Sequence, residues 1–179
     1  ARWGRPHAAD HLGRRWRRRG HNVVDIKHKT SGEILHTCAA RSFEGIDLSS
    51  ACLRGANLAR ANMSRICLRA ADLGLADLNM ANLTHAQLQE AHLNECNLRG
   101  AALLSANLTA AQLVGAELRN ASLFRANLTG ADLSRACLTG ADLEEANLTD
   151  VVLVGARFDR RTRWPKGFDP ASQGAVAEE

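Results

Sequence analysis

The chain has few of the residues from which globular cores are usually built. Tyrosine is absent, and aromatic residues make up only 4% of the 179 residues, so a conventional core of large side chains is not expected. The five cysteines are an odd number without Cys-x-x-Cys spacing, which favours neither a disulfide framework nor a zinc site and indicates a reducing compartment. No apolar run approaches the ~18 residues of a membrane span, and no secretory signal is visible. The composition therefore predicts a soluble protein, assigned to the cytoplasm with an organelle as the alternative.

Catalytic signatures are also missing. The chain has no Gly-x-Ser-x-Gly, no phosphate-binding loop and no His-Glu-x-x-His, which are the local patterns of several large enzyme classes. No pair of histidines has a metal-ligand spacing. The sequence therefore predicts no enzyme activity, no cofactor and no metal site.

Positive charge is concentrated near the start of the chain. Residues 1–40 hold nine Lys and Arg against three Asp and Glu, whereas residues 41–160 hold eleven against thirteen. Within residues 13–20, GRRWRRRG, five arginines surround one tryptophan. Such a segment binds phosphates or an anionic surface, or is simply solvated. The candidate binding residues in it are Arg14, Arg15, Trp16, Arg17, Arg18 and Arg19.

What the sequence does contain is an unbroken five-residue period. Twenty-four pentapeptides follow one another from Arg41 to Arg160, with leucine at the third position in twenty-one and alanine at the first in nineteen. This period fits neither the 3.6 residues of a helical turn nor the alternation of a flat strand. It is satisfied if each pentapeptide forms one side of a square coil, with its first and third residues pointing inward. The third positions then form a core ladder that includes Phe43, Leu48, Leu53, Leu58, Leu83, Leu103, Leu128, Leu148 and Phe158.

Four pentapeptides close one coil, so stacked coils bring residue n beside residue n+20 at about the 4.7–4.9 Å spacing of paired strands. Asn or Asp occupies the second position in twelve repeats and Gly the fifth in seven. These residues suit corners, because they accept unusual backbone angles and bond to the local chain. On this map Leu104 and Phe124 lie one above the other at outward positions, which makes them a candidate contact patch.

The repeated motif A-(D/N)-L-x-x over residues 41–160 resembles the pentapeptide-repeat proteins, in particular the bacterial and cyanobacterial type with a central leucine. The resemblance implies an all-β fold, a right-handed quadrilateral β-helix of about six coils with capped ends. The chain departs from the gyrase-protecting type, in which the central residue is very often phenylalanine and the rod is acidic.

Both ends are expected to act as caps, because the terminal coils of a solenoid expose strand edges and apolar core. The expected hairpin turns at residues 29–32, and Trp164 with Phe168 is expected to cover Leu153 and Phe158. The predicted division is a basic N-terminal tail at 1–20, a capping β-hairpin at 21–40, the β-helix at 41–160, and a C-terminal cap and tail at 161–179.

The expected function is that of a non-enzymatic protein-binding or scaffolding solenoid, with a protein partner and either a monomeric state or a place in a larger assembly. The alternative is a nucleic-acid-related role, through the arginine-rich tail or through DNA mimicry that protects a topoisomerase. Mimicry requires a strongly negative face, and the small charge imbalance of residues 41–160 favours it only weakly.

Overall fold

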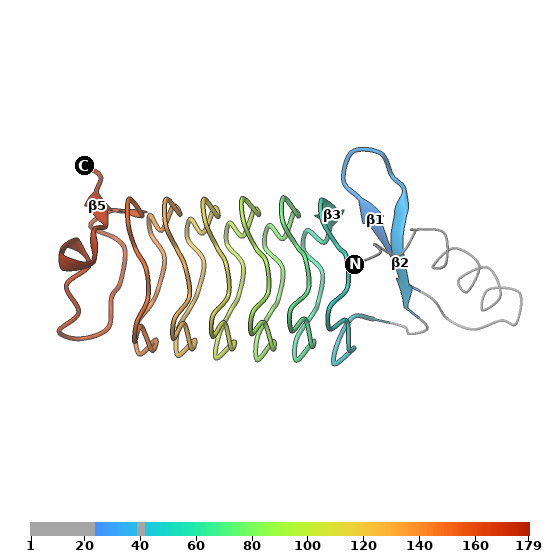
Figure 1. Ribbon diagram of the computed structural model, residues 1–179, viewed down its shortest axis with the longest axis horizontal. Coiled ribbons are helices and arrows are strands. Elements are labelled where there is room, and N and C mark those ends of the chain that lie inside the picture. Colours follow the sequence, from blue (N-terminus) through green and yellow to red (C-terminus); the bar gives the residue numbers. More distant parts are fainter. Residues whose placement is uncertain (1–23, 39–41) are drawn as a thin grey trace, which may run out of the picture.

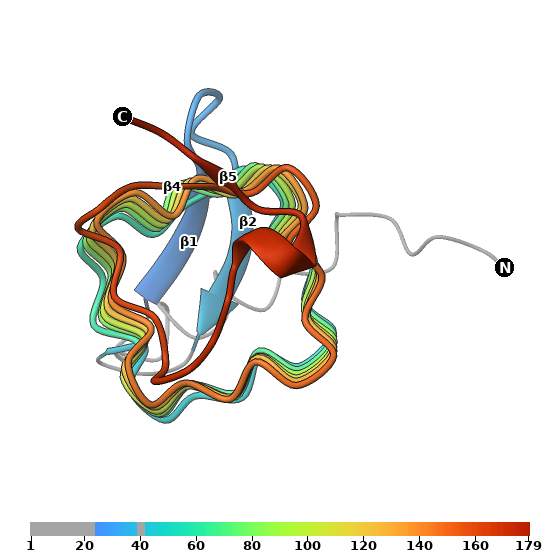
Figure 2. The same cartoon turned by 90° about the vertical axis from the view of Figure 1, so that its left-hand side faces the viewer.

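The computed structural model describes residues 24–38 and 42–179, and within them it contains strands, bridges and turns but no α-helix. The elements, in order, are β1 (Val24–His28), β2 (Ile34–Cys38), β3 (Ala56–Asn57), β4 (Arg157–Phe158), the single 3-10 turn η1 (Ala171–Gln173) and β5 (Val176–Ala177). β1 pairs antiparallel with both β2 and β3 (Figure 1), and β4 pairs parallel with β5 (Figure 2). The predicted all-β class is therefore confirmed for the described part of the chain.

Between β3 and β4 the chain winds into a stack of turns, and the stack has a four-sided outline when viewed along its axis (Figures 1 and 2). Parallel bridges join second-position residues twenty apart, beginning with Asp47 and Cys67. A recurring set of backbone hydrogen bonds accompanies each bridge. For example, the Leu88 N–H donates to the Asn107 carbonyl at 2.7 Å, and the Gln87 N–H donates to the Ile66 carbonyl at 2.9 Å. The predicted pairing of residue n with residue n+20 is confirmed.

Each corner is formed by the fifth residue of a pentapeptide, which has a positive φ. Glycine adopts this conformation freely, but sixteen non-glycine residues at fifth positions also have φ between 52° and 59°, at a cost of about 1–2 kcal/mol each. The second-position Asn and Asp act differently, because their side chains accept the N–H two residues ahead. The Asp72 carboxylate accepts the Gly74 N–H at 3.0 Å, and the Asn107 amide oxygen accepts the Thr109 N–H at 3.1 Å. Fifth-position residues therefore supply the positive φ, and second-position Asn and Asp accept hydrogen bonds from the local backbone.

The third residues form the interior, together with the first-position alanines. Phe43 and Phe158, at the two ends of the ladder, are partly buried and pack against the core. The remaining ladder residues have exposed fractions of 4% or less, except for Leu148 at 8%; they are Leu48, Leu53, Leu58, Leu83, Leu103, Leu128 and Leu148. The core is thus continuous along the stack and slightly less covered at its C-terminal end.

At the N-terminal end, the β1–β2 pair lies against the first coil through β3. Lys27 pairs with Asn57 and His28 with Ala56, while Ile26 is 1% exposed and belongs to the core. The turn expected in this segment is present, because the Gly32 N–H donates to the His28 carbonyl at 3.0 Å. The predicted boundaries of the tail, hairpin, coil and C-terminal segment remain predictions.

At the C-terminal end, three aromatic side chains pack together. Trp164 contacts Phe158 edge-on, with ring centroids 5.6 Å apart, and stacks on Phe168 at 5.4 Å. The expected cover of Phe158 by Trp164 is therefore present. The terminal segment crosses the end of the stack diagonally instead of following its outline (Figure 2).

Candidate functional surfaces

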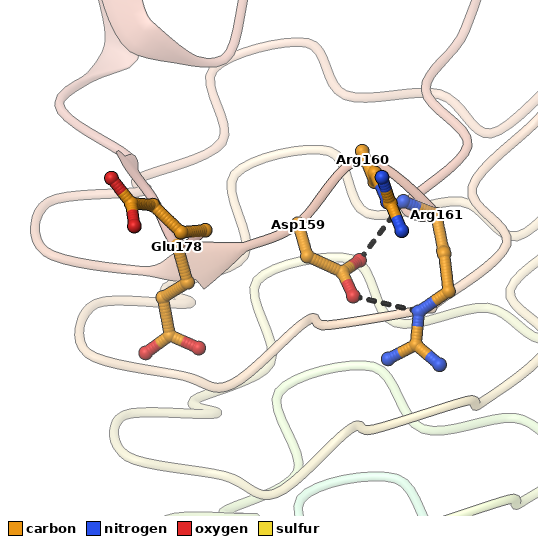
Figure 3. Close-up of a pocket in the computed structure, with 5 residues that line it drawn as sticks. Asp159, Arg160, Arg161 and Glu178 are labelled. Atoms are coloured by element: carbon orange, nitrogen blue, oxygen red, sulfur yellow. Dashed lines mark hydrogen bonds and ion pairs between the residues drawn. The ribbon is translucent and has the colours of Figure 1, made fainter.

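An open recess near the C-terminal end is lined mainly by charged residues. Figure 3 shows the Asp159 carboxylate turned toward the Arg161 side chain, with Glu178 lying on the other side of the recess. One Asp159 oxygen accepts the Arg161 Nε–H at 2.8 Å, and the other accepts the Gly140 N–H at 2.8 Å. The Thr162 hydroxyl lies 3.1 Å from the same carboxylate.

These contacts give Asp159 a structural role. Burial opposes the charge of Asp159, but the hydrogen bonds from Arg161, Gly140 and Thr162 outweigh it and hold the pKa of the carboxyl well below its usual range. The Thr162 hydroxyl also lies 2.9 Å from the Leu138 carbonyl, a second acceptor for its single proton. The group therefore joins the terminal segment to the preceding coil, and we assign it no ligand.

The cysteines differ in exposure from one coil to the next. Cys52 is exposed and Cys67 is half-buried, whereas Cys137, which also occupies a second position, is 1% exposed. The Arg119 side chain from the preceding coil lies over it, with Nε 3.1 Å from Sγ. Burial raises the pKa of the Cys137 thiol, but hydrogen bonds from Thr139 and Arg119 outweigh this effect and lower it. All five cysteines are free thiols.

Leu104 and Phe124 belong to one side of the stack, here called the Phe124 side, which comprises residues 81–85, 101–105, 121–125 and 141–145. The Ser105 N–H donates to the Phe124 carbonyl at 3.0 Å, so the two apolar residues occupy equivalent positions on successive coils. Both are half-buried, whereas the sequence predicted them to be exposed. The difference has a physical cause at Phe124, because the Arg125 guanidinium lies 5.0 Å from the ring centroid and covers part of it.

Ion pairs border this apolar pair on the C-terminal side. Arg125 pairs with Glu145 at 2.7 Å, and Arg163 pairs with Glu144 at 2.6 Å and with Asp142 at 3.3 Å. Each carboxylate in the cluster has a cationic partner. The Phe124 side therefore offers a small apolar centre beside carboxylates that are paired with arginines.

The sequence analysis missed the most exposed apolar side chains. Leu75, Met80, Val152, Val154 and Val176 are 36–61% exposed. Four of them occupy outward second, fourth or fifth positions in the repeat, so their exposure could have been predicted from the five-residue period. Val176 lies outside the repeats and carried no such signal.

Some predicted sites cannot be placed on this structure. Arg14, Arg15, Trp16, Arg17, Arg18 and Arg19 lie outside the described residues. Within residues 24–38 and 42–179, no three His, Cys, Asp or Glu side chains gather as a metal site would require. In the same ranges, no helix has the length and apolar character needed to cross a membrane.

Comparisons with known proteins show which family the chain belongs to. A family model described as pentapeptide repeats matches in eight copies, which together span residues 42–160. A comparison with curated proteins finds no match.

Three solved structures illustrate the similarity. A pentapeptide repeat protein, Rfr23, from the cyanobacterium Cyanothece 51142 is 35% identical over 62% of this chain and 65% of its own, with a TM-score of 0.39. HetL, involved in heterocyst differentiation regulation in Nostoc sp. strain PCC 7120, is 30% identical over 74% of this chain and 73% of its own, with a TM-score of 0.36. QnrB1, a plasmid-mediated fluoroquinolone resistance protein, is 21% identical over 74% of this chain and 77% of its own, with a TM-score of 0.35.

Proposed function

Because the chain belongs to the pentapeptide-repeat family, we propose that it works as a protein-binding or scaffolding rod without enzymatic chemistry. The observation that carries this proposal is the Leu104–Phe124 pair in the middle of the Phe124 side. Regularly stacked sides suit a partner that contacts several coils at once, because every coil presents side chains at nearly the same spacing.

The proposed rod is the right-handed quadrilateral β-helix of this family, with about six coils. Its basic tail would occupy residues 1–20, its capping hairpin 21–40, its coils 41–160 and its C-terminal cap 161–179. The pairing of residues twenty apart and the four-sided outline support this assignment.

The Phe124 side has the composition of a small protein contact surface. An aromatic residue next to an arginine is a common pair at interface centres, and Phe124 with Arg125 supplies both. The Arg125–Glu145 ion pair borders this centre, as a polar rim does. We propose a partner that places an apolar side chain on Leu104 and Phe124, and a carboxylate or amide near Arg125.

A second candidate function rests on the arginine-rich segment at residues 13–20. Five arginines around Trp16 suit a phosphate backbone or another anionic surface, so nucleic-acid binding through Arg14–Arg19 remains the alternative. DNA mimicry has less support, because the charges on the Phe124 side are paired. The five free thiols support a reducing compartment such as the cytoplasm.

The test is affinity capture from a lysate of the source cells, with nuclease treatment and a salt wash. The baits are the whole protein, a form that begins at His21, Phe124→Ser, and Val154→Ser as a control that removes an exposed apolar side chain elsewhere. The proposal expects one defined protein on the first, second and fourth baits and its loss from Phe124→Ser. Retention that requires residues 1–20 and disappears with nuclease would favour the alternative. A partner that binds Phe124→Ser unchanged would remove the Phe124 side as the contact.

A further inference from the structure

The hydrogen bonding between coils is incomplete around the last coil, where the N–H groups of Glu145 and Leu153 also have no acceptor among the described residues, and it is missing altogether from one side of that coil. This side, here called the Asn147 side, comprises residues 106–110, 126–130 and 146–150. In its earlier coils the third and fifth N–H groups donate to the next coil, as Leu128 does to the Asn147 carbonyl and Gly130 to the Thr149 carbonyl, both at 2.9 Å. Among the residues that the structure describes, no group accepts the N–H of Leu148 or Asp150, and none donates to the Ala146 carbonyl.

The preceding side of the same coil pairs with the terminal segment through its first and third residues. The Leu143 N–H donates to the Arg163 carbonyl at 2.7 Å, and the Arg163 N–H donates to the Ala141 carbonyl at 2.9 Å. Pro165 follows two residues after Arg163 and fixes its own φ. The chain then leaves the outline and crosses the end of the stack (Figure 2). Residues 146–150 are therefore left as an open edge by the path of the chain after Arg163.

A recess of about 350 Å³ separates this edge from the crossing segment. The edge forms one wall and Phe168 the other; the lining residues are Ala146, Leu148, Thr149, Pro165, Lys166, Gly167 and Phe168. Ala146 and Leu148 are 7% and 8% exposed, against 1% and 0% for their equivalents one coil earlier, Ala126 and Leu128. Stacking on Trp164 holds Phe168 in place. The recess is small, but its volume is within the lower range of ligand pockets.

We propose that residues 146–150 bind an extended peptide segment of a partner protein, which adds one further parallel side to the coil. Two N–H groups and one carbonyl at coil spacing match the backbone of a single strand, and strand addition to an open edge is a common mode of peptide recognition. The proposal goes beyond the protein binding assigned to Leu104 and Phe124, because it uses a different surface and backbone recognition.

The recess limits which side chains the bound peptide can have. The peptide residue that points inward is small, because Leu148 retains only 8% exposure. The peptide residue before it is Asn or Asp, which would extend the pairing of Asn127 with Asn147. A carboxylate one or two residues later faces Lys166, an exposed cation for which the described residues provide no ion pair. A five-residue peptide, Ala-Asn-Ala-Thr-Glu with blocked ends, meets these requirements.

The first test is amide hydrogen exchange of the whole free protein by NMR. An open edge predicts exchange of the Leu148 and Asp150 amides orders of magnitude faster than that of Leu128 and Gly130. Equal protection of both pairs would show that another part of the chain, or a second copy, already covers the edge, and would overturn the proposal. Measuring protection at several protein concentrations distinguishes these two occupants.

The second test is titration of the isotope-labelled protein with the blocked peptide in millimolar excess. The expected result is a set of chemical-shift changes centred on Leu148 and Asp150, with weaker binding to Lys166→Glu. The matched control peptide is methylated on the nitrogen of its asparagine, which removes the N–H that would donate to Ala146. No shifts at the edge, or equal shifts with the methylated peptide, would overturn strand addition. Neither result depends on Phe124, so the failure of this proposal is distinguishable from that of the proposed function.

Discussion

The imidazole of His28 lies over Gly55 and occupies the space that a β-carbon on residue 55 would need. The next residue is bonded to the same glycine, because the Lys29 N–H donates to the Gly55 carbonyl at 2.9 Å. The Lys29 ammonium reaches one coil further and donates to the Leu75 carbonyl at 2.5 Å. The β1–β2 pair is thus attached to the first coil at a corner where the His28 ring occupies the space of a β-carbon.

Gly55→Ala is expected to destabilise the attachment of β1–β2 as well as the corner. The matched control is Gly130→Ala, since Gly130 has a similar φ of 64° but a β-carbon added there would meet no atom within 4 Å. The control should lose about 1–2 kcal/mol in urea unfolding from backbone strain alone. Gly55→Ala should lose more, because the His28 ring must also move. Hydrogen exchange of β1 should accelerate only in Gly55→Ala; equal losses in the two variants would contradict the steric argument.

Glycine substitution is expected to stabilise corners that carry other residues. Ala110 is exposed with a φ of 55°, so Ala110→Gly should raise the free energy of unfolding by up to about 1 kcal/mol, after the strain relief is reduced by the entropy of glycine. The control is its neighbour Ala111, a first-position residue with 0% exposure. Ala111→Gly should destabilise the protein in the same urea titration. Destabilisation by both changes would mean that the strain at residue 110 is relieved by its surroundings.

Native-state alkylation should distinguish the cysteines by exposure. We expect Cys52 to react first with iodoacetamide and Cys137 to resist, although the lowered pKa of its thiol favours the reactive thiolate, because Arg119 covers Cys137. Arg119→Ala should therefore increase the alkylation of Cys137, measured by mass spectrometry of the intact protein and its peptides. An unchanged rate at Cys137 in this variant would show that Arg119 is not the barrier.

The fold and the binding surfaces differ in how far the sequence predicts them. The five-residue period predicts the n to n+20 pairing, because an inward leucine at the third position of twenty-one of the twenty-four pentapeptides leaves few other arrangements. It does not predict the burial of Cys137, since that depends on where the long Arg119 side chain of another coil lies. It also does not predict the open edge at Leu148, which results from the path taken after Arg163. Long side chains and chain ends are thus the parts that a short repeat leaves undetermined.

The contacts of Asp159 predict a loss of stability in acid. Burial opposes its charge, but the hydrogen bonds from Arg161, Gly140 and Thr162 lower its pKa below the value of about 3.9 for an unfolded chain. A carboxyl group whose pKa is lower when folded stabilises the protein above its unfolded pKa, and this contribution disappears as the pH falls toward the folded pKa. The wild-type protein should therefore lose stability as the pH falls below about 4.

Asp159→Asn should isolate this contribution. At neutral pH its Tm should lie several degrees below that of the wild-type protein, because the neutral amide cannot form an ion pair with Arg161, and the difference should shrink as the pH falls below about 4. The control is Glu90→Gln, which removes an exposed carboxylate that has no ion pair among the described residues. Its Tm should stay close to that of the wild-type protein at both pH values. Calorimetric scans from neutral to acidic pH measure all three proteins, and a constant gap between the Asp159→Asn and wild-type Tm values would exclude the charge of Asp159 as its cause.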